Sequence, residues 1–596
     1  MKIGEYEKFK IPKLLYSVWK HLGIRRQRML CGLMLLMVAS AAGELISLGA
    51  TLPFLSALVN PDQLWSQQRI RDLAQAVGLN SAKELLLPIT TLFIAAAIIS
   101  ALLRSLNLWA NGRMAAAVGS DLAYKAFSLT LFQPYSVHVR RNSSNVISAL
   151  TVSVSNTVNA INSFLRLCSA LIVSISILVG IVLISPFIAL SAAVLFGFSY
   201  VFITIGTRAR LKSNGRRIVD ESIKLLKITQ EGLGSIRDVL LDGTQSIYAE
   251  SFRQSDRPQR LLSADNEFIS TSPRYILEAL GIVFIAILGF ALVNQKDSVI
   301  NAITILGTLA LAAQKLLPSL QQVYAGWANI NGYQEDLQKV LDILSLPTPK
   351  DNCQSGGTVK LKESICFKSV SFRYREDSPL VNNQLNFSVY RGQTIGVIGS
   401  TGSGKSTMLD LFMGLLQPTS GRILIDGHDL YKEKNNVLNA WRASISHVPQ
   451  SIYLTDTSIA ENIAFGISYE EIDIDLLRFA AQSAHIADFI ESLPDGYQNY
   501  VGERGIRLSG GQRQRIGIAR ALYRKANVLV FDEATSALDN ETEKAVMSSV
   551  VGMNRDITLI MIAHRLSTLR NCDRVLRLEN GSIVADEKPN IVIKPN

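Results

Sequence analysis

The sequence predicts two kinds of domain in one chain of 596 residues: an α-helical transmembrane domain with six spans at 1–345 and an α/β domain at 359–596. Three observations predict this organisation. Six long apolar runs lie before residue 320. The stretch SLPTPKDNCQSGGT, rich in Pro, Gly, Ser and Asn, indicates a linker at 346–358. Beyond it, short β-like runs alternate with helical signals.

Each apolar run is long enough, or nearly so, to cross a hydrocarbon layer of about 30 Å as a helix. Together they carry four charged residues, Glu44, Arg166, Glu278 and Lys315. One such run could be a buried helix of a soluble domain. Six of them in one half of the chain exclude that interpretation. The expected spans are Met29–Val59, Leu85–Leu103, Phe164–Ile184, Phe187–Gly206, Tyr275–Val293 and Ser298–Pro318.

The charge distribution predicts the orientation of the chain. The N-terminal 28 residues carry 8 Lys/Arg and 2 Asp/Glu, and segment 207–274 carries 12 and 9, whereas segment 60–84 carries 3 of each. By the positive-inside rule, the N-terminus, the long polar segments and the α/β domain are cytoplasmic. We therefore expect a multi-pass membrane protein.

The overall composition fits this assignment and excludes other classes. Charged residues make up 18% of the chain, against about 25% in ordinary soluble proteins. The net charge of +11 is largely the cytoplasmic surplus that sets topology, so it requires no nucleic acid. Five cysteines without a CxxC pair predict neither a disulfide framework nor a zinc site.

The segment TIGVIGSTGSGKSTMLDLF predicts a phosphate-binding loop. A buried strand at Ile395–Ile398 leads into the pattern G-x-x-x-x-G-K-[ST], and an apolar helix follows. Glycines let backbone amides curl around phosphate oxygens, and the helix N-terminus favours negative charge. Lys405 supplies a point charge for the β- and γ-phosphates, and Ser406 a hydroxyl ligand for Mg²⁺. The predicted ATP-binding residues here are Gly399, Ser400, Thr401, Gly402, Ser403, Gly404, Lys405, Ser406 and Thr407.

The segment VLVFDEATSALD supplies the acidic partner of this loop. A buried strand, Val528–Phe531, ends in Asp532 and Glu533. A carboxylate at a strand end is where Mg²⁺ is held in P-loop proteins, and Glu533 is placed to polarise the attacking water. The second domain is thus predicted to be an α/β P-loop nucleotide-binding domain that hydrolyses ATP with Mg²⁺.

The segment RLSGGQRQRIGIARAL narrows the class, because LSGGQ resembles the signature sequence of ATP-binding-cassette proteins. The resemblance covers residues 360–590. It implies that Tyr374 stacks on adenine, that Gln450 reaches Mg²⁺ and water, and that His564 is a catalytic switch histidine. It also implies that Asp539 communicates across a cassette dimer. The signature residues expected to contact ATP are Ser509, Gly510, Gly511 and Gln512.

The order of the domains resembles that of exporters, and VGERG at 501–505 is similar to an exporter element before the signature. The tips at 133–140 and 232–242 would be coupling helices. One P-loop and one signature per chain imply a C₂ homodimer, with a heterodimer of sister half-transporters as the alternative. An ATP-gated channel or regulator on the same fold is a more distant alternative.

Three cations within or beside the spans bear on the substrate: Arg104, Arg274 and Lys315. They either pair with Glu44 and Glu278 or reach an interface, or they form a basic cavity for an anionic headgroup. GELISLGATLPFLSAL, SPRYILEALGIVF and LAAQKLLPSLQQV resemble segments of bacterial lipid-linked oligosaccharide flippases and heterocyst glycolipid or polysaccharide exporters. This resemblance implies export or flipping of a lipid-linked oligosaccharide or glycolipid across the bacterial inner membrane. Multidrug, lipid A-type and peptide exporters are the alternatives.

Overall fold

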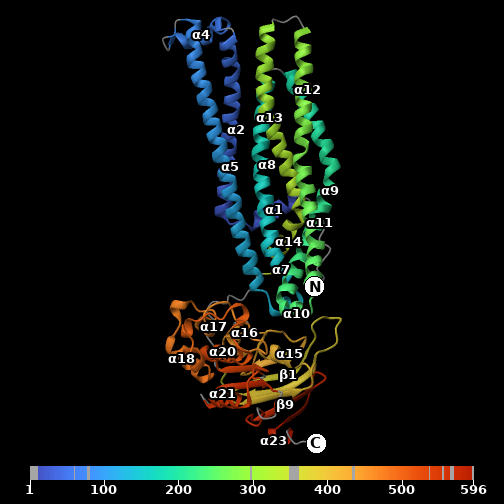
Figure 1. Ribbon diagram of the computed structural model, residues 1–596, viewed down its shortest axis with the longest axis vertical. Helices are drawn as coiled ribbons and strands as arrows, with labels where there is room; N and C mark the ends of the chain where they lie inside the picture. The colour runs from blue at the N-terminus through green and yellow to red at the C-terminus, as the bar shows by residue number, and fades with distance from the viewer. Residues whose placement is uncertain are drawn as a thin grey trace. The chain divides into compact units, whose positions relative to one another are not determined.

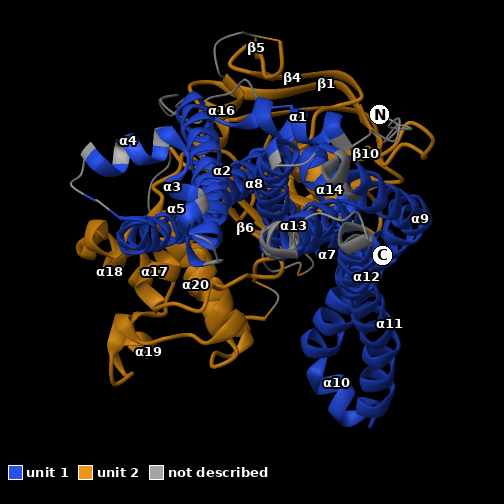
Figure 2. Ribbon diagram, turned by 90° about the horizontal axis from the view of Figure 1, so that it is seen from above, with its two compact units in different colours: residues 1–133, 141–348 blue, residues 134–140, 349–596 orange. Residues whose placement is uncertain are grey.

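The structure is a computed structural model. It describes residues 11–592 except 60, 77–78, 80, 185, 295–298, 348–360, 433–436, 536, 553–555, 564 and 566–568. The chain divides into two compact units, coloured separately in Figure 2. Unit 1 contains residues 1–133 and 141–348, and unit 2 contains residues 134–140 and 349–596. Most of the predicted linker lies outside the described residues.

Unit 1 is built from long helices that run side by side (Figure 1). α5 has 46 residues and α9 has 49. At 1.5 Å per residue they are about 70 Å long, more than twice the thickness of a hydrocarbon layer. They therefore extend well beyond a span, as the long polar segments predict. The helices of unit 1 are α1 Ile11–His21, α2 Ile24–Val59, α3 Pro61–Trp65, α4 Gln68–Ala76, η1 Ala82–Leu85, α5 Leu86–Leu131, α7 Ser143–Ser148, η2 Ala149–Ser153, α8 Val154–Ile184, α9 Pro186–Gly234, α10 Ile236–Leu241, α11 Gln245–Thr271, α12 Pro273–Asn294, α13 Val299–Gly332 and α14 Gln334–Leu344.

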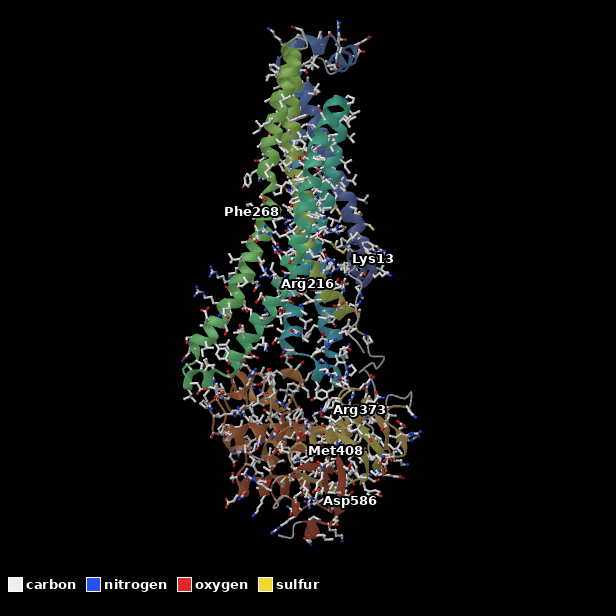
Figure 3. All side chains as sticks on the ribbon, turned by 90° about the vertical axis from the view of Figure 1, so that its right-hand side faces the viewer. Lys13, Arg216, Phe268, Arg373, Met408 and Asp586 are labelled. Atoms are coloured by element: carbon white, nitrogen blue, oxygen red, sulfur yellow. The ribbon has the colours of Figure 1, made fainter. Side chains whose placement is uncertain are left out.

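Within the described residues, five helical segments are long and apolar enough to cross a membrane: Ile24–Leu58, Ala82–Leu131, Ser143–Leu183, Ala193–Gly234 and Gln245–Ile287. The sixth expected span falls on α13, where a crossing stays a prediction. Many large apolar side chains on these helices are exposed, among them Leu35, Leu183 and Phe202. Such surfaces suit lipid rather than water. Phe268 on α11 also points outward (Figure 3).

The helices of unit 1 pack in neighbouring pairs, α2 with α5, α8 with α13 and α9 with α11. α2 also packs on α8 and α13. A small apolar core at this crossing contains Leu48, Ile177, Ile181, Ala312 and Leu316. The crossing brings the faces of α2, α5, α8 and α13 together around a polar cavity, described below.

Unit 2 contains two sheets and the helices that cover them (Figure 1). The antiparallel sheet has the order β2-β1-β4-β5, and the second sheet has the order β10-β9-β3-β8-β7-β6. The strands are β1 Ser364–Phe372, β2 Asn382–Tyr390, β3 Thr394–Gly399, β4 Ser420–Ile425, β5 His428–Asp429, β6 Ile445–Val448, β7 Val528–Asp532, β8 Thr558–Ile562, β9 Arg574–Glu579 and β10 Ser582–Glu587. The helices are α6 Tyr135–Arg140, α15 Lys405–Phe412, α16 Val437–Ala443, α17 Ile459–Ile463, α18 Ile474–Ser483, α19 Ala487–Glu491, α20 Gly510–Tyr523, α21 Asn540–Gly552 and α23 Pro589–Val592.

The second sheet positions the predicted ATP site. β3 pairs in parallel with β8 and β9, and β7 pairs in parallel with β8 and β6. These strands are apolar throughout because helices cover both faces. Ile395, Val397, Val530 and Ile560 are fully buried, and so is Met408 on α15 (Figure 3). The carboxyl ends of β3, β6, β7 and β8 therefore meet at one edge.

Candidate functional site

The phosphate-binding loop connects β3 to α15. Gly402 and Gly404 have φ values of +83° and +94°, a left-handed region that disfavours other residues. A Cβ on Gly404 would also lie 2.7 Å from Asn382 Nδ2. Lys405 Nζ donates hydrogen bonds to the carbonyls of Gly399 (2.8 Å) and Ser400 (2.9 Å), which holds the ammonium group against the loop. The structure thus forms the nest of glycines and lysine that the motif predicts.

The acidic pair lies at the same sheet edge as this loop. β8 separates β3 from β7, so the strand that leads into the loop and the strand that ends in Asp532 lie about 9–10 Å apart, two strand spacings. Glu533 follows β7 with a φ of +51°, a strained value for this residue type. Gln450, just after β6, donates from Nε2 to Glu533 Oε2 at 2.7 Å. Two predicted site residues that are 83 residues apart in the sequence, Gln450 and Glu533, therefore come together.

Tyr374 lies against the end of the phosphate-binding loop. Its ring packs edge-on against Phe372, with 5.0 Å between the centroids. Its hydroxyl is 3.1 Å from Thr407 Oγ1. An aromatic ring is thus present where the resemblance implies one, and its stacking on adenine stays a prediction.

The signature residues begin helix α20. Ser509 is the N-cap: its hydroxyl accepts from the Gln512 amide (3.2 Å), and Gln512 Oε1 accepts from the Ser509 amide (2.8 Å). This reciprocal capping box explains the spacing of Ser509 and Gln512. Gly510 and Gly511 lie in the first turn, close to Ala537 and Leu538. The helix N-terminus, with small residues around it, is suited to an anion.

The residues of unit 2 fit ATP and Mg²⁺. Ser403 Oγ is buried in the loop without a hydrogen-bond partner, as expected for a group that meets phosphate. In the described part of the chain, no three His, Cys, Asp or Glu side chains form a metal cluster. Mg²⁺ would therefore rely on the Ser406 hydroxyl, the Asp532 carboxylate, Gln450 and the phosphates themselves, which matches its usual coordination. His564 lies outside the described residues.

Asp410 is an acidic residue of this region that the sequence analysis does not single out. It lies one helical turn after Ser406 on α15, so the two share a face. Burial, together with the nearby Asp532 carboxylate, raises the pKa of Asp410 to about 6. Its position four residues after Ser406, the serine predicted to bind Mg²⁺, was the available signal in the sequence.

The short helix α6 belongs to unit 2, although its neighbours in the chain belong to unit 1. Arg140 donates a hydrogen bond to the carbonyl of Tyr374. Burial, aided by Asp410 and Tyr374, raises the pKa of Tyr135. The first tip predicted as a coupling helix therefore packs beside the ATP-site residues. The second tip contains α10 and belongs to unit 1.

In unit 1, two of the three predicted cations converge on one carboxylate. Glu44 on α2 is 2% exposed. Arg104 Nη1 donates to Glu44 Oε1 at 2.9 Å, and Lys315 Nζ donates to Glu44 Oε2 at 2.7 Å and to Ser47 Oγ at 3.1 Å. Arg104 and Lys315 thus pair with Glu44, one of the alternatives expected for these cations. Two cations on one anion still leave a charge of +1.

Arg274 is not part of this cluster. It pairs with Glu278, one turn later on α12, at 2.6 Å. Both side chains are about half exposed, and neither lines the cavity beside Glu44. The structure therefore separates Arg274 from Arg104 and Lys315, because a local partner four residues away satisfies its charge.

A polar cavity of about 510 Å³ lies between α2, α5, α8 and α13. Arg104 lines it from α5, and Arg166 lines it from α8. Arg166 was visible as the single charge of its apolar run, but the sequence could not place it on the same cavity as Arg104. Most of the other lining side chains are uncharged and polar, and four are apolar. The polar ones are Ser40, Ser105, Asn107, Asn111, Ser169, Ser319 and Gln322, and the apolar ones are Ala101, Leu108, Ala170 and Val173. Within a membrane domain, such a concentration of polar groups is expected to mark a functional site.

Comparisons with known proteins identify the class to which these two units belong. A family model described as ABC transporter matches residues 382–536, and one described as ABC transporter transmembrane region matches residues 31–315. The chain belongs to the ABC transporter family, as a half-transporter with one transmembrane domain and one ATP-binding cassette. Its cassette is an ATPase domain that uses ATP and Mg²⁺.

Curated relatives include two proteins named ATP-dependent lipid A-core flippase. The one from Saccharophagus degradans is 31% identical over 474 residues, 78% of each chain. The one from Alkalilimnicola ehrlichii is 32% identical over 395 residues, 66% of each chain. The leukotoxin translocation ATP-binding protein LktB of Mannheimia glucosida is 40% identical over 281 residues. That match covers 47% of this chain and 38% of the relative, so this chain spans about two fifths of the length of LktB.

A solved structure of a bacterial Atm1-family ABC exporter with ATP bound has a similar fold. The TM-score is 0.77, and the match covers 95% of this chain and 96% of that one. Sequence identity is 24%, so the likeness concerns the fold alone. It confirms the predicted order of a helical transmembrane domain and an α/β nucleotide-binding domain.

Proposed function

We propose that this chain is an ATP-driven exporter that moves a lipid-linked oligosaccharide or glycolipid across the bacterial inner membrane. The observation that carries the proposal is the polar cavity of the transmembrane domain, whose Arg104 and Arg166 face an anionic headgroup. The Lys315–Glu44–Arg104 cluster lies at its edge and carries a surplus positive charge. The relatives named lipid A-core flippases support a lipid substrate in general.

Two copies of the chain would form the working unit. Each copy has one phosphate-binding loop and one signature helix, so a C₂ dimer supplies two equivalent sites. Ser509 and Gly511 of the partner subunit would then close on ATP that is bound by the first copy. Because the positive-inside pattern orients the spans, both cassettes and the N-terminus would be cytoplasmic.

The residues of the cassette have separate roles in hydrolysis. Mg²⁺ neutralises charge that develops on the phosphates during transfer. Lys405 and the loop amides orient the phosphates, and Tyr374 holds the base. Gln450 keeps the Glu533 carboxylate in place at 2.7 Å, from which Glu533 can take a proton from water. His564 would stabilise the transferring group.

Coupling to the membrane domain would use α6 and α10. Since α6 belongs to unit 2 and is joined directly to α5 and α7, a movement of the cassette is transmitted through the chain itself. α10, at the tip between α9 and α11, would provide the second connection (Figure 2). The opening of the cavity would thereby follow closure of the cassettes.

The proposal is tested by flipping in proteoliposomes. The assay would present a polyprenyl diphosphate oligosaccharide and lipid A-core in separate vesicles, with ATP. Arg104→Gln and Arg166→Gln should each reduce oligosaccharide-lipid flipping by about tenfold or more, which corresponds to the loss of one charged contact. Arg274→Gln is the matched control, because its partner Glu278 lies outside the cavity. Efficient movement of lipid A-core alone, or equal flipping by all variants, contradicts the proposal.

A further inference from the structure

The Lys315–Glu44–Arg104 cluster contains one more cation than its carboxylate needs. The side chain of Glu44 is 2% exposed, whereas those of Arg104 and Lys315 are 57% and 30% exposed. Charges within a membrane domain are costly, and a buried carboxylate needs only a single well-placed cation as its partner. The pair formed by Glu44 on α2 and Arg104 on α5 therefore leaves Lys315, on α13, without an explanation.

The cluster lies where α2 and α5 approach each other closely. A Cβ on Gly43, the neighbour of Glu44, would lie 3.0 Å from Leu103 Cδ1 and 3.5 Å from Ser100 Cα. The small residue thus allows α2 to pack against α5 directly beside Arg104. This packing holds the Glu44 carboxylate in one place, and both cations converge on it.

The two cations differ in how many of their donors the cluster uses. Lys315 Nζ has three N–H donors, and two of them donate to Glu44 Oε2 at 2.7 Å and to Ser47 Oγ at 3.1 Å. The Arg104 guanidinium has five donors, and among the described residues it uses one, in the bond to Glu44 Oε1 at 2.9 Å. Arg104 therefore keeps most of its donors for another partner, whereas Lys315 keeps one.

The two cations also differ in their position relative to the polar cavity. Among the three described residues of the cluster, Arg104 lines the cavity, and Glu44 and Lys315 do not. On α13 the wall is formed by Ser319 and Gln322, which lie about one and two turns after Lys315. An anion in the cavity would therefore meet Arg104 directly, and it would sense Lys315 only across the Glu44 carboxylate.

The balance of charge explains the extra cation. With Glu44 alone, Arg104 would form a neutral pair, and the carboxylate would weaken the attraction of the guanidinium for an anion in the cavity. With Lys315 present, two cations and one anion leave a net charge of +1. Glu44 can then hold the Arg104 guanidinium in place, because Lys315 offsets the negative charge that does so.

We propose that Lys315 is a positioning residue, which acts through Glu44 to keep Arg104 oriented and attractive to the transported anion. The inference rests on the proposed function and deepens it, because it assigns contact with the anion to Arg104 and not to Lys315. In this arrangement the net charge of the cluster matters, and the lysine itself does not. A variant that lacks both Lys315 and the charge of Glu44 should therefore bind the anion nearly as the wild type does.

The test is a charge-restoration experiment on the full chain in lipid nanodiscs. The probe is the polyprenyl diphosphate oligosaccharide, and both the half-maximal concentration for stimulation of ATPase activity and the maximal stimulated rate are measured. Lys315→Met changes the charge of the cluster from +1 to 0. The half-maximal concentration should therefore rise by about tenfold, the effect of one partly screened unit charge at a distance of several ångströms, with the maximal rate retained.

The double variant Lys315→Met, Glu44→Gln loses one cation and one anion, so its cluster returns to +1. The oxygen of the introduced amide can still accept from Arg104 and hold the guanidinium. The half-maximal concentration should therefore return to within about threefold of the wild-type value.

Two controls separate the effect of charge from that of folding. Arg274→Met and Glu278→Gln, alone and together, make the same changes in an ion pair of α12 that does not line the cavity, so they should keep the wild-type half-maximal concentration. The effect of Lys315→Met should shrink as NaCl is raised from about 0.05 M to about 0.5 M, because salt screens the charge. This second measurement requires only the single variant. Circular dichroism of the nanodisc complexes reports whether each variant is folded.

The outcomes that overturn the inference differ from the outcome that overturns the proposed function. If the double variant binds as weakly as Lys315→Met, Lys315 contacts the anion itself, and the positioning role is excluded. If Lys315→Met lowers the maximal rate without changing the half-maximal concentration, or if its effect is independent of salt, the electrostatic role is excluded. Each of these results leaves the proposed function standing. Failure of the wild type to respond to the polyprenyl diphosphate oligosaccharide removes the proposed function, and the positioning role with it.

Discussion

We expect the Glu44 carboxylate to stabilise the cluster that it forms with Arg104 and Lys315. It is 2% exposed and accepts from Arg104 at 2.9 Å and from Lys315 at 2.7 Å. Glu44→Gln keeps the shape of the side chain but removes its charge. The new amide has one acceptor for two cations, and its NH₂ group must face the other cation as a donor.

The magnitude follows from these contacts. Removing one member of a buried ion pair costs about 3–5 kcal/mol. Arg104 is 57% exposed and Lys315 is 30% exposed, so water in the cavity compensates part of the loss. We therefore expect Glu44→Gln to lower the free energy of unfolding by about 2–3 kcal/mol, near the value of one charged hydrogen bond.

The assay is a double-mutant cycle with Lys315→Met, which removes the second cation at similar length. Unfolding of the purified full-length chain in mixed micelles would be followed by circular dichroism. In the double variant, the oxygen of the introduced amide is free to accept from Arg104, so part of the loss should return as a coupling energy of about 1 kcal/mol or more. Effects that add to within about 0.5 kcal/mol would refute a shared carboxylate. Glu278→Gln, in the exposed pair with Arg274, should cost less.

Three further predictions concern the cassette and helix α14 of unit 1. Glu533→Gln should reduce ATPase activity by about 100-fold or more while ATP binding, measured by equilibrium dialysis, persists; undiminished hydrolysis would exclude Glu533 as the base. Ser509→Ala should destabilise the chain by about 1 kcal/mol through loss of the α20 cap, and Ser509→Thr should restore most of it; equal melting of all three forms contradicts the capping role. Burial raises the pKa of Asp336, which Asn156 contacts at 2.9 Å, so the folded chain holds that proton more tightly than the unfolded chain. The contribution of this proton to stability is full at low pH and is lost as pH rises through the raised pKa. Asp336→Asn should therefore gain stability relative to wild type as pH rises from about 4 to about 8. A difference in melting temperature that stays constant over this range would contradict the prediction.

The ATP site could be predicted in detail because its parts are short and contiguous. The loop from Gly399 to Thr407 contains in one stretch the glycines, the lysine and the hydroxyl that phosphate binding needs. Ser509 and Gln512 are likewise a capping box that depends only on spacing within one helix. Asp410 was missed because its relation to Asp532 depends on the neighbourhood of α15 and β7, which are more than a hundred residues apart in the chain.

The membrane cavity shows the opposite case. Arg104 and Arg274 look alike in the sequence, since each lies at the end of an apolar run. In the structure Arg104 joins Glu44 and the cavity, whereas Arg274 pairs within its own helix. The sequence shows Arg166 only as a single charge in an apolar run, and the packing of α5 on α8 places it on the same cavity as Arg104.

The sequence by itself determined that the chain has an apolar helical half and an ATP-binding half, and it predicts which residues of the cassette hold phosphate. These properties depend on composition, periodicity and local motifs, which act over a few turns or strands. Only the tertiary structure decided which intramembrane charges meet. Glu44 lies 60 residues from Arg104 and 271 from Lys315, so their pairing depends on how α2, α5 and α13 pack. The same packing leaves the oxygens of Asn107 and Asn111 unpaired beside the cations.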